Sequence, residues 1–97
     1  MRKYGRTDNT QTEIVKQMRS IGFTVAITSA VGSGFPDAVA SMSGTTFLVE
    51  FKSKGGKLTA EQVIFHNEWH DDICIAETID DVLLYWKQKN RGGRVRG

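Results

Sequence analysis

The sequence has little cysteine and proline and no long hydrophobic run. The single cysteine, Cys74, can form neither an internal disulfide nor a cysteine-rich zinc site, which is typical of a reducing cytosol. The longest apolar run, 82–86, is far shorter than the roughly 20 residues that a membrane-spanning helix needs. The first residues are basic rather than apolar, so no secretory signal is expected. These absences predict a cytoplasmic protein.

The chain of 97 residues is long enough for one small domain and too short for a second core. With 39% hydrophobic and 25% charged residues, its composition is that of a folded rather than a disordered chain. A chain this short buries only about 60–65% of its surface, so its stability is marginal and self-association would add to it. We therefore expect a single domain over 1–97 that forms a homodimer.

Both ends of the chain lack negatively charged residues. Residues 1–6 and 87–97 contain no Asp or Glu, whereas residues 7–86 contain all 11 acids against five Lys and Arg, a balance of −6. The ends, about 1–6 and 91–97, are predicted to be flexible basic arms that contact a polyanion. The cations assigned to nucleic-acid binding there are Arg2, Lys3, Arg6, Arg91, Arg94 and Arg96.

Hydrophobic periodicity and turn residues predict the element order α-β-β-β-α-β-α, a sheet flanked by helices. The expected helices cover 10–21, 59–70 and 78–90, and the expected strands cover 23–28, 37–42, 46–53 and 73–76. Two helix starts have the spacing of a capping box, Thr10 with Glu13 and Thr59 with Gln62.

Three charged residues lie on the second and third expected strands. Strand side chains alternate, so Glu50 and Lys52 share one face, and a hairpin can place Asp37 beside Glu50. Two converging carboxylates suit a hard cation such as Mg²⁺ or Mn²⁺, and a nearby lysine can contact phosphate or orient water. Metal and lysine together meet the needs of phosphodiester hydrolysis. Taken alone, the tripeptide Glu50-Phe-Lys52 is more typical of an exposed ion pair.

The ordered set of motifs resembles the VRR-NUC (virus-type replication-repair nuclease) group of the PD-(D/E)xK nuclease superfamily. The resemblance rests on Gly34-Phe-Pro-Asp37, Glu50-Phe-Lys52, Gly55-Gly-Lys-Leu-Thr59 leading to Gln62 and His66, and Ile79-Asp-Asp-Val82, and it covers roughly residues 10–86. It implies a restriction-endonuclease-like core with a mixed central sheet. The virus-type family also makes a phage or prophage gene, acting in a bacterial host, one expected source.

The resemblance implies an Mg²⁺-dependent endonuclease for branched DNA such as four-way junctions, acting in repair or recombination. Asp37, Glu50 and the carbonyl of Phe51 would hold Mg²⁺, for which Mn²⁺ would substitute, and Lys52 would position the attacking water and stabilise the transition state. Lys54 and Lys57 are assigned to DNA binding. Symmetrical cutting of a junction requires two sites, which also favours a homodimer.

Two further residues each have two interpretations. Glu13 either caps its helix or completes the metal site, as an acid of the first helix often does in the superfamily. Gln62 either caps its helix with Thr59 or, as the resemblance implies, faces the catalytic strand and contacts phosphate or a metal-bound water. These roles are compatible with each other.

Other chemistries have less support. His66 and His70 are four residues apart, but Asn67 stands where a zinc hydrolase has its glutamate, so a packing or supporting role is expected for His66. Cys74 between two isoleucines is expected to be buried. The alternative to the nuclease is a non-catalytic nucleic-acid-binding module with a vestigial pocket; an enzyme for a small substrate has less support still.

Overall fold

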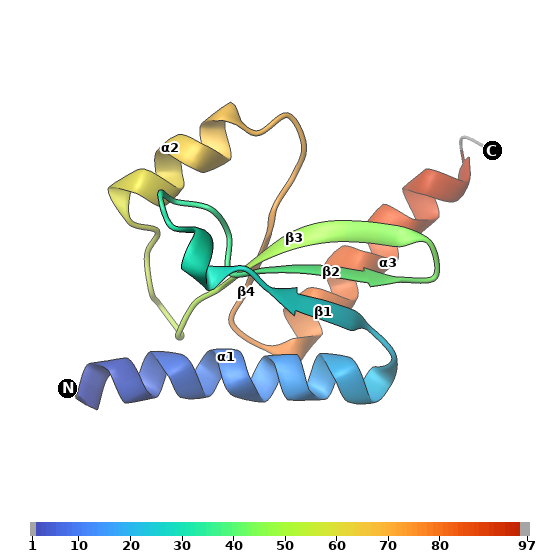
Figure 1. Ribbon diagram of the computed structural model, residues 1–97. Helices are drawn as coiled ribbons and strands as arrows, with labels where there is room; N and C mark the ends of the chain where they lie inside the picture. The colour runs from blue at the N-terminus through green and yellow to red at the C-terminus, as the bar shows by residue number, and fades with distance from the viewer. Residues whose placement is uncertain (1, 96–97) are drawn as a thin grey trace.

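The computed structural model describes the backbone of residues 2–95 and the side chains of residues 9–91. Its elements follow the expected order, with one short 3₁₀ helix added between the first two strands (Figure 1). They are α1 (Arg2–Ile21), β1 (Thr24–Ile27), η1 (Ser29–Val31), β2 (Ala38–Met42), β3 (Thr45–Phe51), α2 (Ala60–Glu68), β4 (Cys74–Ala76) and α3 (Ile79–Val95).

The four strands form one mixed sheet in the order β1-β2-β3-β4. Strands β1, β2 and β3 make an antiparallel meander, and β4 pairs with β3 in parallel after the excursion through α2. The β2–β3 turn is tight, with Ser43 and Gly44 both at positive φ. The chain is therefore an α/β protein with a four-stranded mixed sheet and three helices, as the sequence predicts at that level.

Helices α1 and α3 pack against the same face of the sheet and bury the core. The alternating residues of β3, Phe47, Val49 and Phe51, face these helices, as predicted from the apolar spacing. The stripe on α1 is Ile14, Val15 and Met18. Cys74 is buried in the same core, which confirms its predicted packing role, and burial raises the pKa of its thiol to about 12.

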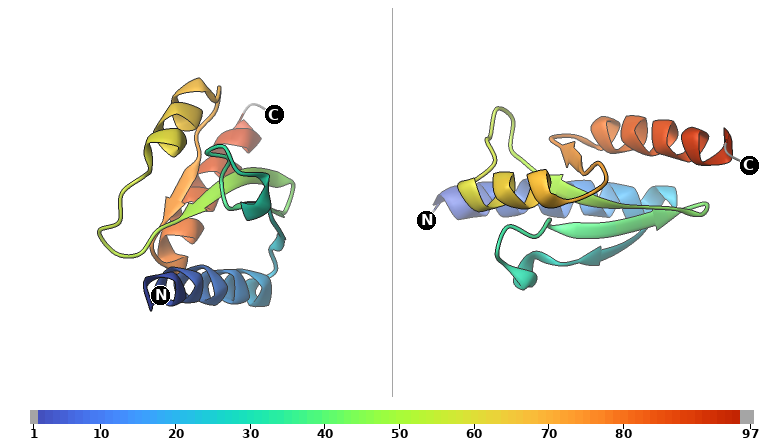
Figure 2. Two further views of the ribbon diagram at one scale, coloured as in Figure 1. Left: turned by 60° about the vertical axis from the view of Figure 1, so that its left-hand side comes forward. Right: turned by 90° about the horizontal axis from the view of Figure 1, so that it is seen from above.

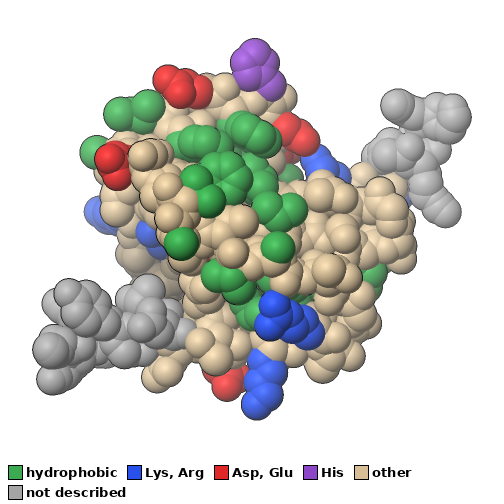
Figure 3. Space-filling model, viewed as in Figure 1, with side chains coloured by type: hydrophobic (Ala, Val, Ile, Leu, Met, Phe, Trp, Pro, Cys, Tyr) green, Lys and Arg blue, Asp and Glu red, His purple; other side chains and the backbone are tan. Residues whose placement is uncertain are grey.

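Helix α2 lies apart from α1 and α3, beyond the end of the sheet at which β3 finishes (Figures 1 and 2). The face of the sheet opposite α3 has no long helix over it, and apolar side chains gather near its centre (Figure 3). Among the described residues, none of the helices has the length and apolar character to cross a membrane.

The two terminal helices are longer than predicted. Helix α1 begins at Arg2 rather than at Thr10, so Thr10 and Glu13 lie inside the helix and do not cap it, and the backbone of residues 91–95 continues α3 rather than forming an arm. The apolar spacing marks only the turns that touch the core, and residues 2–9 contain no proline to stop a helix. The side chains of Arg2, Lys3, Arg6 and Arg94, and all of Arg96, lie outside the described residues.

Candidate active site

The register of the meander brings the two predicted carboxylates together. Ala38 pairs with Val49, so the next step along both strands sets Asp37 opposite Glu50. Opposite residues in an antiparallel pair have Cβ atoms about 4.5–5.5 Å apart. Asp37 is held in place because its Oδ2 accepts a 2.9 Å hydrogen bond from the backbone N–H of Phe51.

The loop before Asp37 is fixed by contacts to its neighbours on both sides. On the β1 side, the N–H of Thr28 donates to the carbonyl of Asp37 at 2.7 Å, and its hydroxyl donates to the carbonyl of Pro36 at 2.8 Å. On the α2 side, Gly34 is so close that a Cβ there would lie 2.3 Å from the carbonyl oxygen of Glu61. This backbone contact holds the first turn of α2 against the strand that positions Asp37.

Glu50 is the one buried charged residue among the described side chains, with an exposed fraction of 0%. Its Oε2 accepts a 2.8 Å hydrogen bond from Gln62 Nε2, and its Oε1 lies 3.2 Å from His66 Nε2. Burial, and then the negative charge of Asp37, raise the pKa of Glu50 to about 8, against a smaller opposing effect of Lys52. The repulsion between buried Glu50 and the neighbouring Asp37 favours the binding of a cation, which would offset both negative charges.

Gln62 caps its helix and also faces the end of β3. Its Oε1 accepts from the N–H of Thr59 at 2.8 Å, and its N–H donates to the Thr59 hydroxyl at 3.2 Å, which completes the capping box. The same Oε1 accepts a 2.9 Å hydrogen bond from Lys52 Nζ, while Nε2 donates to Glu50. The Gln62 amide therefore links the start of α2 to Glu50 on β3 and to Lys52, which directly follows β3.

His66 has a supporting position next to Glu50, one of the two roles expected for it from the sequence. It lies one helical turn after Gln62 and supports the other oxygen of Glu50. Burial, and then the positive charge of Lys52, lower its pKa, so the ring is neutral at pH 7 and can donate one N–H. The spacing of four residues between Gln62 and His66 was the available signal, because it places both side chains on one helix face.

The carbonyl of Phe51 lies on the same side of β3 as Asp37. Adjacent residues of a strand direct their backbone groups to opposite sides, and the N–H of Lys52 donates to the carbonyl of Ala76 on β4 at 2.9 Å. The backbone groups of Phe51 therefore point away from β4, toward Asp37, which accepts from the N–H. This is the side on which the resemblance places Phe51 as a ligand.

The structure does not bring Glu13 to the two carboxylates. Glu13 is exposed on α1 and lines a separate groove together with Glu77, at the start of α3. Lys54 and Lys57 are exposed on the loop that follows Lys52, and Arg91 is exposed on α3. His70 is exposed beyond the end of α2.

The donor atoms at the site fit a hard divalent cation. Asp37, Glu50 and the Phe51 carbonyl offer only oxygen, which Mg²⁺ prefers, and Mg²⁺ keeps several water ligands when bound by one or two carboxylates. Within residues 9–91, no group of three or more His, Cys, Asp or Glu side chains is arranged to hold a metal. The arrangement therefore suits a water-rich magnesium site rather than a closed structural zinc site.

No protein-family model, no curated protein and no solved structure matches this chain.

Proposed function

We propose that this protein is an Mg²⁺-dependent DNA endonuclease with a restriction-endonuclease-like core of the VRR-NUC, PD-(D/E)xK type. The observation that supports it most is the convergence of Asp37, Glu50 and Lys52 at one end of the sheet, with Glu50 fully buried and bonded by α2. A buried glutamate beside a second carboxyl group is costly to the fold unless it has a use, because burial disfavours the charged form of Glu50.

Asp37, Glu50 and the Phe51 carbonyl would hold the ion. When bound, Mg²⁺ supplies positive charge at the phosphate and lowers the pKa of a water ligand. Lys52 would place a second positive charge beside the substrate, and its hydrogen bond to Gln62 holds the ammonium group near Glu50. Gln62 and His66 hold the two oxygens of Glu50 in one orientation. The electrostatic part of catalysis is thus organised before substrate binds.

We propose branched DNA, such as a four-way junction, as the substrate and a homodimer as the active form. One chain supplies one site, and symmetrical cutting of a junction needs two. Sedimentation of the active protein with and without a junction tests this. A protein that cuts both strands of a junction while remaining a monomer would contradict the dimer.

A non-catalytic nucleic-acid-binding module is the second candidate. One observation favours it: both oxygens of Glu50 already have partners from α2, as in a structural polar cluster. Such a module would bind nucleic acid by phosphate contacts alone, so its affinity would fall with salt and be indifferent to Mg²⁺.

One experiment separates the two candidates. Labelled four-way junction, flap and duplex are incubated with wild type, Glu50→Gln and Lys52→Ala, each in Mg²⁺ and in EDTA. The nuclease predicts cleavage by wild type in Mg²⁺ only. Cleavage that persists in EDTA or in both variants refutes the proposed mechanism. A wild type that binds without cleaving any of the three favours the binding module.

A further inference from the structure

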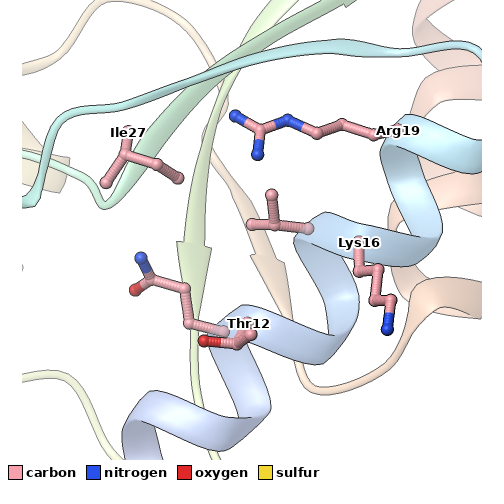
Figure 4. A pocket seen from close by; sticks show the side chains of 6 residues that line it. Thr12, Lys16, Arg19 and Ile27 are labelled. Carbon is pink, nitrogen blue, oxygen red and sulfur yellow. The ribbon is translucent and has the colours of Figure 1, made fainter.

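A groove between α1 and the edge strand β1 is a second feature of the molecule, separate from the carboxylate pair. It has a volume of about 370 Å³ and is shown in Figure 4. Its lining consists of Gln11, Thr12, Val15, Lys16, Arg19 and Ile27. The five α1 residues recur at helical spacing and so form one face of the helix.

The groove has a basic and hydrogen-bonding lining with an apolar floor. No acid lines it, and neither Lys16 nor Arg19 forms an ion pair with the described residues. Val15 is buried at its base, and Ile27 is 48% exposed. The opposite flank of α1, by contrast, lines a groove that contains Glu13 and Glu77. Anionic ligands are therefore attracted to one flank of α1 and repelled from the other.

Arg19 is held across the groove before any ligand binds. Its Nη2 donates a 2.7 Å hydrogen bond to the carbonyl of Val25 on β1, and Figure 4 shows the side chain extending from α1 toward Ile27. A guanidinium has five N–H donors, and within the described residues Arg19 makes no other hydrogen bond. Lys16 also lines the groove, and in Figure 4 its side chain points away from Arg19 and Ile27. The remaining donors of Arg19 can bind phosphate oxygens with little loss of side-chain freedom.

The groove lies at the β1 edge of the sheet, at the same end as Asp37 but on the face that α1 covers. Ile27 pairs with Ala38, the residue after Asp37, and β1 and β3 are about 10 Å apart because they are separated by one strand. The five cations of residues 7–86 fall into two groups, one after β3 (Lys52, Lys54 and Lys57) and one at the groove (Lys16 and Arg19). Ile27 shares the α1 face of the sheet with Val25, whereas Glu50 faces the opposite side, so a nucleic-acid strand bound at the carboxylates reaches the groove by passing around the edge strand β1.

We propose that this groove binds the sugar–phosphate backbone of the nucleic-acid strand a few nucleotides away from the scissile phosphate. Phosphate oxygens would bind Arg19 and Lys16, Gln11 and Thr12 would donate hydrogen bonds, and the sugar would pack on Ile27. The assignment of the strand to the substrate rests on the proposed function, whereas the anion-binding character of the groove rests on its own lining.

The test measures binding in EDTA, so that cleavage does not interfere. A labelled single-stranded oligonucleotide of about 20 nucleotides is titrated with wild type, Lys16→Gln and Arg19→Gln at several salt concentrations. Each variant should bind at least about threefold more weakly and lower the slope of log affinity against log salt by about 0.7, the value for one lost contact to a single strand.

A matched pair of variants on one helix provides the control. Gln11→Glu and Gln17→Glu introduce the same charge on α1, but Gln11 lines the basic groove and Gln17 the acidic one. Gln11→Glu should weaken binding, and Gln17→Glu should change it much less. Thermal unfolding followed by circular dichroism shows whether each variant is folded.

The outcomes separate this inference from the proposed function. Three results would refute strand binding in the groove, whether or not wild type cleaves DNA in Mg²⁺. The first is equal weakening of binding by Gln11→Glu and Gln17→Glu. The others are unchanged binding by the Lys16 and Arg19 variants, and a wild type that binds no oligonucleotide. Groove-dependent binding by a wild type that never cleaves supports the groove and counts against the nuclease.

Discussion

Glu50 both destabilises the fold, because its carboxyl group is buried, and lies at the centre of the candidate site. Its carboxyl group is fully buried, lies next to Asp37, accepts a hydrogen bond from Gln62 and contacts His66 Nε2. Spacing on a strand predicts that Glu50 and Lys52 share a face, because alternation is a property of any strand. The burial of Glu50 was not predictable, since it depends on α2 folding over the end of β3.

The raised pKa of Glu50 predicts a pH dependence of stability in the metal-free protein. The group titrates at about 8 in the folded chain and near 4.5 in the unfolded chain, so between these values the folded state binds more protons. Stability should therefore fall as pH rises toward 8. The lowered pKa of His66 acts in the opposite direction, below its ordinary value of 6.5, so the window from pH 6.5 to 8 isolates Glu50.

Urea unfolding in EDTA across this window measures the effect. Wild type should lose stability relative to Glu50→Gln by at most about 1.4 kcal/mol per pH unit, the limit for one proton. If the unfolding free energies of the two proteins change equally with pH across this window, the pKa of Glu50 is not raised.

His66 is predicted to act by orienting Glu50. Replacing it with alanine leaves Oε1 of Glu50 without its partner, and loss of such a supporting bond commonly lowers metal affinity by about 10–100-fold. The Mg²⁺ concentration for half-maximal cleavage should rise accordingly in His66→Ala and largely recover in His66→Gln, which retains a donor. If both variants keep the wild-type Mg²⁺ dependence, the ring only fills space.

At the scale of elements, the site depends on the contact between the loop before β2 and the start of α2. The sequence indicates the Thr59 helix start, but local signals do not show which part of the sheet α2 approaches. Gly34 determines this approach, because its φ of +83° and its lack of a side chain let the loop before β2 contact the backbone of Glu61 at the start of α2. Local signals also misplaced the start of α1, because the capping-box spacing of Thr10 and Glu13 occurs inside a longer helix.

Gly34→Ala should therefore disturb the site far more than an equivalent change elsewhere. Gly44 is the matched control, because its φ is +81° but a Cβ there meets nothing within 4 Å. Gly44→Ala should cost about 1–2 kcal/mol through its backbone conformation alone. Gly34→Ala should cost more and also reduce cleavage, because α2 must move. Chemical unfolding and cleavage rates measure both effects, and equal losses in the two variants would exclude the packing explanation.

At the scale of the whole molecule, charge is segregated. Seven of the 11 acids follow residue 60, and the groove beside β1 has none. The sequence already shows an acidic body between basic ends, but only the fold separates the flanks of α1 into one basic and one acidic. Lys16 and Arg19 were not assigned a role from sequence because strand β1 supplies the other wall of their groove.

The basic C-terminal segment is predicted to contribute binding rather than chemistry. Deleting residues 91–97 removes three arginines. Each arginine that contacts a phosphate of duplex DNA adds up to about 0.9 to the slope of log affinity against log salt. Binding of a duplex should weaken and its salt dependence flatten, while the cleavage rate at saturating protein stays within about twofold of wild type. Loss of turnover at saturation would place this segment in the catalytic machinery.

The central claim is that the Asp37, Glu50 and Lys52 cluster hydrolyses DNA. Single-turnover cleavage of a four-way junction in Mg²⁺, at saturating protein, tests it with Lys52→Met and Lys54→Met as a matched pair, since Lys52 bonds Gln62 in the site and Lys54 is exposed on the adjoining loop. Lys52→Met should slow cleavage by at least about 100-fold, whereas Lys54→Met should weaken binding and leave the saturated rate close to wild type. Wild-type cleavage by Lys52→Met, or no Mg²⁺-dependent cleavage by wild type, would contradict the account.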